Sequence, residues 1–501
     1  MNRLRKLLLD TALLTGVGLL MRLLGMGFSV YLSKLLGAAG VGLFELLMSV
    51  YGMAVVLAVS GIRLSAIRLV VEHGGAARSV MALCIRYALT LGGLACAALM
   101  FSARLIAQSW LDAPETELSL RILALSLPFI AVSAALSGYF TAARKASRYA
   151  FVQVAEQLCR IALSVILLRS LLQKGINYAC VALVIANCGA ESLSLLLTYL
   201  LYRWEQLPYT IRRPKLLGEL LAIALPDAVG SWVRSALLTA KQLLIPRGLR
   251  AFGASPDSAL ATYGVIQGMA LPVLSFPAAF LGALAGLLIP EVAECHASGK
   301  QERMRYIIRR VVHVTLLFSF GAMGLLLAFA QPLGTLLYNN REAVLYIRLL
   351  APIAPLIYLD ITVDAFLKGL GLQTASMRYN IIDAAMCLTL VLVLIPRIGI
   401  PGYLAMIGLS ETLNLILSIG KLRRVTGFEP EAVHNVLLPA AAALIPLLWG
   451  ELVYNQLCYA MPQTGALIAA MLWVTAGYWA TLFLLGAATP EDWHWFKSIF
   501  K

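Results

Sequence analysis

The sequence predicts an all-α integral membrane protein of about fourteen transmembrane helices, arranged as two six-helix lobes followed by two C-terminal helices. Three observations favour this fold. Of the 501 residues, 60% are hydrophobic and only 13% are charged, a composition outside the range of soluble domains. Apolar runs of about 20 residues, the length that crosses the hydrocarbon core, recur along the chain. Three short motifs also occur twice in the same order.

The predicted spans are separated by charged or Pro- and Gly-rich turns. Their approximate ranges are 7–35, 43–70, 80–101, 120–143, 151–172, 178–202, 216–245, 263–289, 307–330, 344–367, 377–395, 402–422, 436–454 and 464–485. Residues 1–25 lack a small-x-small cleavage motif, so they are interpreted as part of a retained first helix rather than a signal peptide. The glycine-rich segment 37–42 is interpreted as a turn. Pro272 and Pro277 in one span predict a bent helix.

An internal repeat defines the predicted lobes. The matching motifs are Arg121-Ile-Leu-Ala-Leu-Ser-Leu-Pro128 with Arg348-Leu-Leu-Ala-Pro-Ile-Ala-Pro355, Ser147-Arg148-Tyr149 with Met377-Arg378-Tyr379, and Glu191-Ser-Leu-Ser-Leu195 with Glu411-Thr-Leu-Asn-Leu415. Their nearly constant offset predicts that spans one to six are repeated as spans seven to twelve. We therefore expect lobes at 1–210 and 211–425, with the last two helices and a cytoplasmic tail at 426–501. Two like-oriented lobes suit rocking about a central cavity.

The net charge of +15 arises from short Lys and Arg clusters between apolar runs, which is the pattern of a topology signal rather than of a nucleic-acid-binding face. With a cytoplasmic N-terminus, roughly two dozen Lys and Arg fall in inside loops, including Arg212, Arg213 and Lys215, against roughly ten outside. Both termini are therefore predicted to be cytoplasmic. The eight cysteines and five histidines lack metal-ligand spacing, so no cofactor is expected apart from a coupling sodium ion or proton.

About a dozen ionisable residues fall inside the predicted spans, and facing lipid they would cost on the order of 30 kcal/mol. We therefore expect most of them to line a wet cavity or to pair with one another. The cations gather in the first lobe and in span seven. They are Arg22, Arg63, Arg68, Arg86, Arg160, Arg234 and Lys241. Arginines bind phosphate bidentately, so these seven residues are predicted to bind an anionic substrate.

Acidic residues predominate in the second lobe, where Asp360, Asp364, Asp383 and Glu411 lie inside spans. Asp227 follows Pro226 in span seven, and Asn380 lies near Asp383 in span eleven. Asp227, Asn380 and Asp383 supply oxygen ligands of the kind that a sodium ion or a proton relay needs. They are predicted to form a cation-coupling site, although ion pairs also explain buried acids.

Several motifs together resemble one family. They are Arg22-Leu-Leu-Gly25, Gly40-Val-Gly-Leu-Phe44, Ile223-Ala-Leu-Pro226, Gly268-Met-Ala-Leu-Pro272, Ile289-Pro-Glu291 and Lys368-Gly-Leu-Gly371. The sequence resembles the stage V sporulation protein B-like polysaccharide exporters of the MOP superfamily, which also includes MATE exporters and the lipid II flippase MurJ. The resemblance implies two six-helix lobes around a cationic cavity. It also implies flipping of undecaprenyl-pyrophosphate-linked oligosaccharides or a peptidoglycan precursor such as lipid II, by alternating access in a bacterial cell membrane.

The same resemblance bears on individual residues. Arg22 matches the first cavity arginine of MurJ-like proteins, and Arg68-Leu-Val-Val-Glu72 is similar to their second-helix motif. Phe28 stands where MurJ-like proteins carry a second arginine. That departure concerns substrate identity, and Arg63 could supply a comparable charge from span two.

Three other functions remain as alternatives. A MATE-like cation-coupled exporter of organic cations would need acidic and aromatic groups in the first-lobe cavity. A membrane-embedded transferase would need a catalytic acid or histidine at a membrane face, with a large loop or a metal motif. A scaffold without transport would leave the intramembrane charges without a purpose. We therefore expect a monomeric transporter rather than an enzyme, with a lipid-linked oligosaccharide and membrane lipids as partners.

Overall fold

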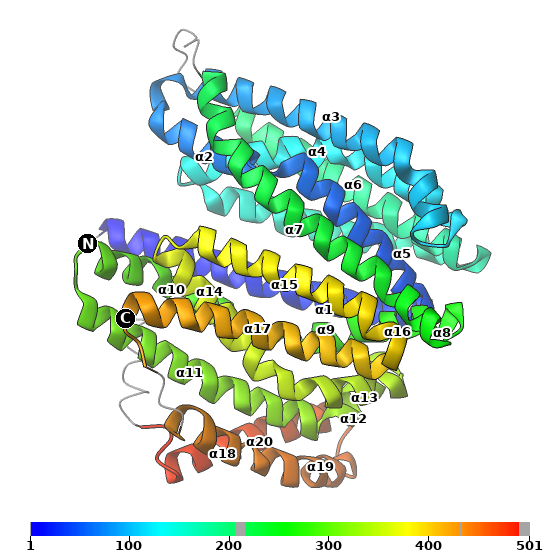
Figure 1. Cartoon of the computed structure of the whole chain (residues 1–501), viewed down its shortest axis with the longest axis vertical. Coiled ribbons are helices and arrows are strands. Elements are labelled where there is room, and N and C mark those ends of the chain that lie inside the picture. The colour runs from blue at the N-terminus through cyan, green and yellow to red at the C-terminus, as the bar shows by residue number, and fades with distance from the viewer. Residues whose placement is uncertain (1, 206–215, 430–432, 490–501) are drawn as a thin grey trace. The chain divides into compact units, whose positions relative to one another are not determined.

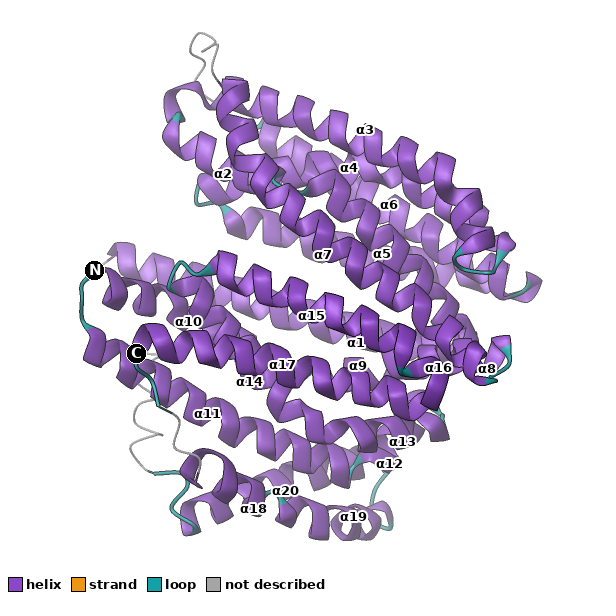
Figure 2. Cartoon of the chain, in the orientation of Figure 1, coloured by secondary structure: helices purple, strands orange, loops and turns teal. Residues whose placement is uncertain are grey.

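The computed structural model describes residues 2–205, 216–429 and 433–489, and within them the chain forms only helices, turns and loops (Figures 1 and 2). In this described part, 13 segments are long and apolar enough to cross a membrane. One of them, Gly16–Glu72, has 57 residues and covers the second predicted span and most of the first, and each of the other segments overlaps one of the remaining predicted spans. The predicted all-α membrane fold of about fourteen crossings is therefore confirmed.

Seven helices, six of them long, are numbered in chain order in Figure 1 and form the first half. They are α1 (Asn2–Val59), α2 (Ile62–Glu72), α3 (Ala77–Ser109), α4 (Glu117–Ala142), α5 (Ala146–Leu171), α6 (Ile176–Arg203) and α7 (Leu216–Phe252). The turn predicted over 37–42 is reduced to a kink inside α1, where Gly37 has φ 68 and ψ 179. Glycine adopts this left-handed φ without the penalty of a Cβ atom, so α1 passes through two predicted spans without a loop.

The second half is more interrupted. Its helices are α8 (Pro256–Gly264), α9 (Leu271–Ser275), α10 (Ala278–Ala297), α11 (Gln301–Ala328), α12 (Ala330–Pro332), α13 (Arg341–Leu350), α14 (Ala354–Gly369), α15 (Gln373–Val393), α16 (Ile395–Ile398), α17 (Ile400–Thr426), α18 (Leu438–Ala442), α19 (Leu444–Cys458) and α20 (Gln463–Leu484). Proline explains two of the breaks, because it removes a helix hydrogen bond. Pro277 separates α9 from α10 as predicted, and Pro352 lies in the turn between α13 and α14.

Contacts divide the chain into two compact units that exchange short segments. The first unit comprises Met1–Phe28, Leu36–Arg247 and Pro256–Leu260, and the second comprises Ser29–Leu35, Gly248–Ser255 and Ala261–Lys501. The lobe boundary predicted at residue 210 differs from this division because most of α7 packs within the first unit. The Thr239 hydroxyl, for example, donates to the Ser49 carbonyl of α1 at 3.2 Å. Residues 206–215, with Arg212, Arg213 and Lys215, and 490–501, with the predicted tail, lie outside the described residues.

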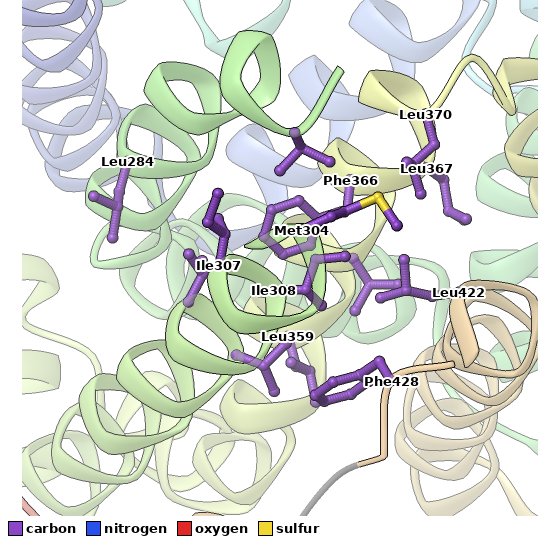
Figure 3. Close-up of a cluster of buried hydrophobic side chains, with 14 of the residues drawn as sticks. Leu284, Met304, Ile307, Ile308, Leu359, Phe366, Leu367, Leu370, Leu422 and Phe428 are labelled. Atoms are coloured by element: carbon purple, nitrogen blue, oxygen red, sulfur yellow. The ribbon is translucent and has the colours of Figure 1, made fainter. Parts of the chain in front are cut away.

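A buried hydrophobic cluster in the second unit includes side chains of α14 and α17, two of the helices that carry its acidic residues. Figure 3 shows Met304 and Ile308 of α11 packed with Phe366 and Leu367 of α14, and all four side chains are fully buried. The predicted C-terminal helices are attached to α11 as well. The buried Tyr478 of α20 donates a hydrogen bond to the Leu317 carbonyl at 2.7 Å.

Candidate functional site

The second predicted span, 43–70, is broken at Gly61. Gly61, with φ 75, separates α1 from α2, and at 1.5 Å per residue it lies about 14 Å before the end of that predicted span, inside the segment expected to cross the bilayer core. A Cβ atom on Gly61 would lie 2.5 Å from the Ala224 carbonyl oxygen of α7. The first hydrogen bond of α2 runs from the Ser65 amide to the Gly61 carbonyl at 3.0 Å. The amides ahead of it form a helix N-terminus, which favours anions.

Arg63 occupies the first turn of α2, and its side chain is exposed. Its backbone is held against α4, because a Cβ atom on Gly138 would lie 2.8 Å from the Arg63 carbonyl oxygen. Arg63 also interacts electrostatically with Tyr149 of α5, which in turn interacts with Glu156 and Glu191. The first turn of α2 therefore carries a guanidinium that interacts electrostatically with Tyr149 of α5.

The neighbouring helices α2 and α7 carry four of the seven predicted cations. Arg63 and Arg68 are exposed on α2, Arg234 is exposed on α7, and Lys241 is half-buried there. Asp227, Arg234 and Lys241 follow one another at seven-residue intervals, which places them on one face of α7. In the described part of the chain, none of these four cations forms an ion pair. We call Arg63, Arg68, Arg234 and Lys241 the α2/α7 cations.

Arg160 differs from these residues because it has two acidic partners. Its Nη2 atom donates to Glu156 Oε1 at 2.5 Å on the same helix, α5, and lies 3.4 Å from Glu191 Oε1 on α6. Burial without such partners would be costly for a charge. Arg160 was predicted as a substrate-binding cation, but in this structure both of its contacts are with the protein's own carboxylates.

The remaining predicted cations lie elsewhere in the first unit. Arg86 belongs to an exposed stripe of α3 with Leu94, which is 66% exposed, and Phe101, which is 87% exposed. Such an apolar stripe is typical of a lipid-facing surface, from which a long arginine side chain can reach the interface. Arg22 is exposed on the part of α1 that belongs to the first unit. Arg22 and Arg86 are therefore not on α2 or α7, the helices that carry four of the other predicted cations.

The acids of the second unit form a hydrogen-bonded group across α14, α15 and α17. Its contacts are Asn414 Nδ2 to Asp360 Oδ2 (2.9 Å), Ser410 Oγ to Asp383 Oδ1 (2.7 Å), Ser376 Oγ to Asp364 Oδ1, and Lys368 Nζ to Asp364 Oδ2 (2.5 Å). A hydroxyl or amide group donates to one oxygen of each of these three half-buried carboxylates, as polar groups withdrawn from water require. Asp360 Oδ1 is buried without a hydrogen-bond partner among the described residues.

The predicted coupling residues are divided between the two units. Asn380 and Asp383 lie one turn apart on α15 of the second unit, where Asn380 donates to the Ser376 carbonyl at 2.8 Å. Asp227 is exposed on α7 of the first unit. Among the described residues, no cluster of three or more His, Cys, Asp or Glu side chains could hold a metal ion. The coupling role of these three residues stays a prediction.

A buried polar group that includes Asn187, one helical turn before Glu191 on α6, was not predicted from the sequence. Asn187 Nδ2 donates to the Tyr51 hydroxyl at 3.3 Å, and that hydroxyl lies 2.6 Å from Ser126 Oγ. All three side chains are buried. Single polar residues in apolar spans give no signal of which neighbours they will meet. The break at Gly61 did have a signal, since Gly and Ser pairs are a recognised cause of sharp kinks and Ser60 precedes Gly61.

Two family models match the sequence. One is described as polysaccharide biosynthesis protein and matches residues 7–283, and the other, MatE, matches residues 251–394. Stage V sporulation protein B of Bacillus subtilis (strain 168) is 25% identical over 408 residues, which span 78% of this chain and 79% of that protein. Sporulation protein YkvU of the same strain is 26% identical over 197 residues, 39% of this chain and 43% of that protein.

Solved structures share the fold. The lipid II flippase MurJ in an inward closed conformation superposes with a TM-score of 0.70 at 13% identity, covering 94% of this chain and 98% of that chain. A multidrug resistance MATE family transporter of the MOP superfamily, in an inward-facing conformation, gives a TM-score of 0.63 at 13% identity, with 83% and 98% coverage. The MATE- and MurJ-like fold predicted from the sequence is therefore confirmed.

Proposed function

Because the chain belongs to the polysaccharide biosynthesis protein family and is a multi-pass membrane protein with the fold of MOP-superfamily transporters, we propose that it flips an anionic lipid-linked oligosaccharide across a bacterial cell membrane. The substrate class is an undecaprenyl-pyrophosphate-linked sugar or a peptidoglycan precursor such as lipid II. Transport proceeds by alternating access, with both termini in the cytoplasm.

The break at Gly61 is the observation that carries this proposal. A helix that starts inside a membrane turns the positive end of its dipole and its first amide groups toward whatever lies there. Arg63 adds a full positive charge in the same turn. Phosphate and pyrophosphate are the biological anions that match a guanidinium beside free amides.

The other α2/α7 cations extend the positive region along two packed helices. Arg234 and Lys241 lie about 10 Å apart along α7 at 1.5 Å per residue, a spacing that suits a ligand with more than one anionic group. The related proteins also favour this substrate class, since MurJ is a lipid II flippase and the matching family is one of polysaccharide biosynthesis.

The test is a flipping assay with the full-length protein in proteoliposomes. Fluorescent lipids that carry a pyrophosphate-linked sugar are compared with neutral and cationic lipids of the same tail. We expect transport of the pyrophosphate lipid only, and we expect Arg63→Ala to slow it about 10- to 100-fold, the equivalent of one lost charge-assisted contact. Arg104→Ala is the control. It removes an exposed arginine near the C-terminal end of α3, and we expect it to leave the rate unchanged. Equal rates for Arg63→Ala and wild type would contradict the proposal.

A MATE-like exporter of organic cations is the second candidate. The observation that favours it is the pair of carboxylates, Glu156 and Glu191, in the first unit, because such an exporter needs acids there. The same assay separates the two functions, since this candidate requires transport of a cationic dye that is abolished by Glu156→Gln or Glu191→Gln.

A further inference from the structure

The first unit contains two carboxylates that share one guanidinium. We call Glu156, Arg160 and Glu191 the carboxylate–arginine cluster. The side chains of Glu156 and Glu191 are only 17% and 14% exposed. Arg160 is the one cation within ion-pair distance of either carboxylate among the residues that the structure describes. With both acids ionised, this largely buried cluster would carry one uncompensated negative charge.

The groups around Glu191 do not remove that charge. Tyr51 of α1, Tyr149 of α5 and Cys188 of α6 interact with it electrostatically, and each is neutral or would add negative charge. Ser126 Oγ donates to the Leu123 carbonyl at 2.8 Å, so it accepts the proton of Tyr51. The Tyr51 hydroxyl therefore donates its proton to Ser126 and not to Glu191.

Arg63 of α2 is the other cation near this group, and it acts on Tyr149. It is not within ion-pair distance of Glu156 or Glu191 in the described structure. When two buried acids share one cation, uptake of a single proton relieves their repulsion. Glu191 is the better acceptor of that proton, because its oxygen lies 3.4 Å from Arg160 Nη2 whereas that of Glu156 lies at 2.5 Å.

The guanidinium of Arg160 also has a donor without an acceptor in the described part of the chain. Its Nε atom is buried and has no hydrogen-bond partner among the described residues, although a donor in such a position ordinarily has an acceptor. A neutral Glu191 would hold Nη2 more weakly than an ionised one. Arg160 would then offer more than one donor to an incoming anion, which is the arrangement that phosphate prefers.

We propose that proton uptake by Glu191 removes one of the two carboxylate partners of Arg160, so that its guanidinium can bind a phosphate group of the anionic ligand while it keeps its contact with Glu156. This inference rests on the proposed function, because it assumes an anionic substrate. In effect, Glu156 and Glu191 occupy Arg160 as internal counter-ions until one of them is neutralised. Anion binding to the first unit is therefore linked to the uptake of one proton, at a position separate from Asp227, Asn380 and Asp383.

The experiment measures proton uptake directly. Geranyl pyrophosphate, a short lipid pyrophosphate, is titrated into the purified full-length protein by calorimetry, between about pH 6 and about pH 8, in two buffers with different ionisation enthalpies. The difference in heat between the buffers gives the number of protons taken up. Because the probe itself titrates in this range, the wild-type value is compared with that of Glu191→Gln, which binds the same probe.

We expect the wild type to take up one proton more than Glu191→Gln does. On the alkaline side of the Glu191 titration, wild-type affinity should fall about tenfold per pH unit relative to that variant. Glu117→Gln is the matched control, since Glu117 also pairs with an arginine four residues later, Arg121, at 2.6 Å, but at an exposed helix end. It should give the wild-type proton count.

Arg160→Gln should bind the probe more weakly and should lose the extra proton. Probe binding by the wild type without proton uptake at any pH would overturn this inference and would leave the proposed function intact. Absence of any pyrophosphate binding would overturn both. The two-buffer comparison on the wild type needs no variant, so the inference stays testable even if Glu191→Gln does not fold.

Discussion

Substitution of Gly61 by alanine tests the geometry on which the candidate site depends. Gly61 has φ 75, and a residue with a Cβ atom loses about 1–2 kcal/mol in the left-handed region. The new methyl group would also lie 2.5 Å from the carbonyl oxygen and 2.6 Å from the Cα atom of Ala224. Both are backbone atoms, so α2 and α7 would have to separate, and overpacking of this kind costs about 1–3 kcal/mol.

We therefore expect Gly61→Ala to lower the free energy of unfolding by about 2–5 kcal/mol, measured by chemical unfolding of the purified protein in mixed micelles. Gly52→Ala is the control on α1, since a Cβ atom there would meet nothing within 4 Å. Alanine has the higher helix propensity, so this variant should be as stable as the wild type or up to about 1 kcal/mol more stable. Similar stabilities for Gly61→Ala and Gly52→Ala would refute the packing argument.

Two further substitutions probe the attachment of the C-terminal helices to α11. Tyr478→Phe removes the hydrogen bond to the Leu317 carbonyl. We expect it to lower the free energy of unfolding by about 0.5–1.5 kcal/mol in the same measurement. An unchanged free energy of unfolding would mean that packing of the ring, and not the hydrogen bond, attaches α20 to α11. Asn435→Ala removes the acceptor that lies 2.7 Å from Nδ1 of the buried His313. A cost of about 1–3 kcal/mol is expected, and a variant as stable as Gly52→Ala would contradict this role for the contact.

The positions of the spans could be predicted from sequence because the length and polarity of a crossing are local properties. The turn predicted at Gly37 was wrong in form, since the residues around it continue as helix. The assignment of α7 to a lobe could not be made from the repeat, because it depends on contacts such as that between Gly61 and Ala224. Those contacts join residues far apart in the chain.

The candidate site was predictable to a similar degree. Charged residues inside apolar spans singled out the α2/α7 cations as candidates, and their role in binding substrate stays a prediction. The pairing of Arg160 with Glu156 follows a four-residue helical spacing and could have been read from the sequence. Its second partner, Glu191, lies on another helix. The periodicity within one helix does not predict contacts between two helices.

The exchange of segments between the units has a consequence for biogenesis. The first unit includes α7 as far as Arg247, and the second includes Ser29–Leu35 of α1. Domains generally fold as they emerge from the ribosome, but here neither unit is an uninterrupted stretch of chain. The first cannot close until its seventh helix has left the translocon, and a piece of the earliest helix must wait in the bilayer for partners synthesised much later.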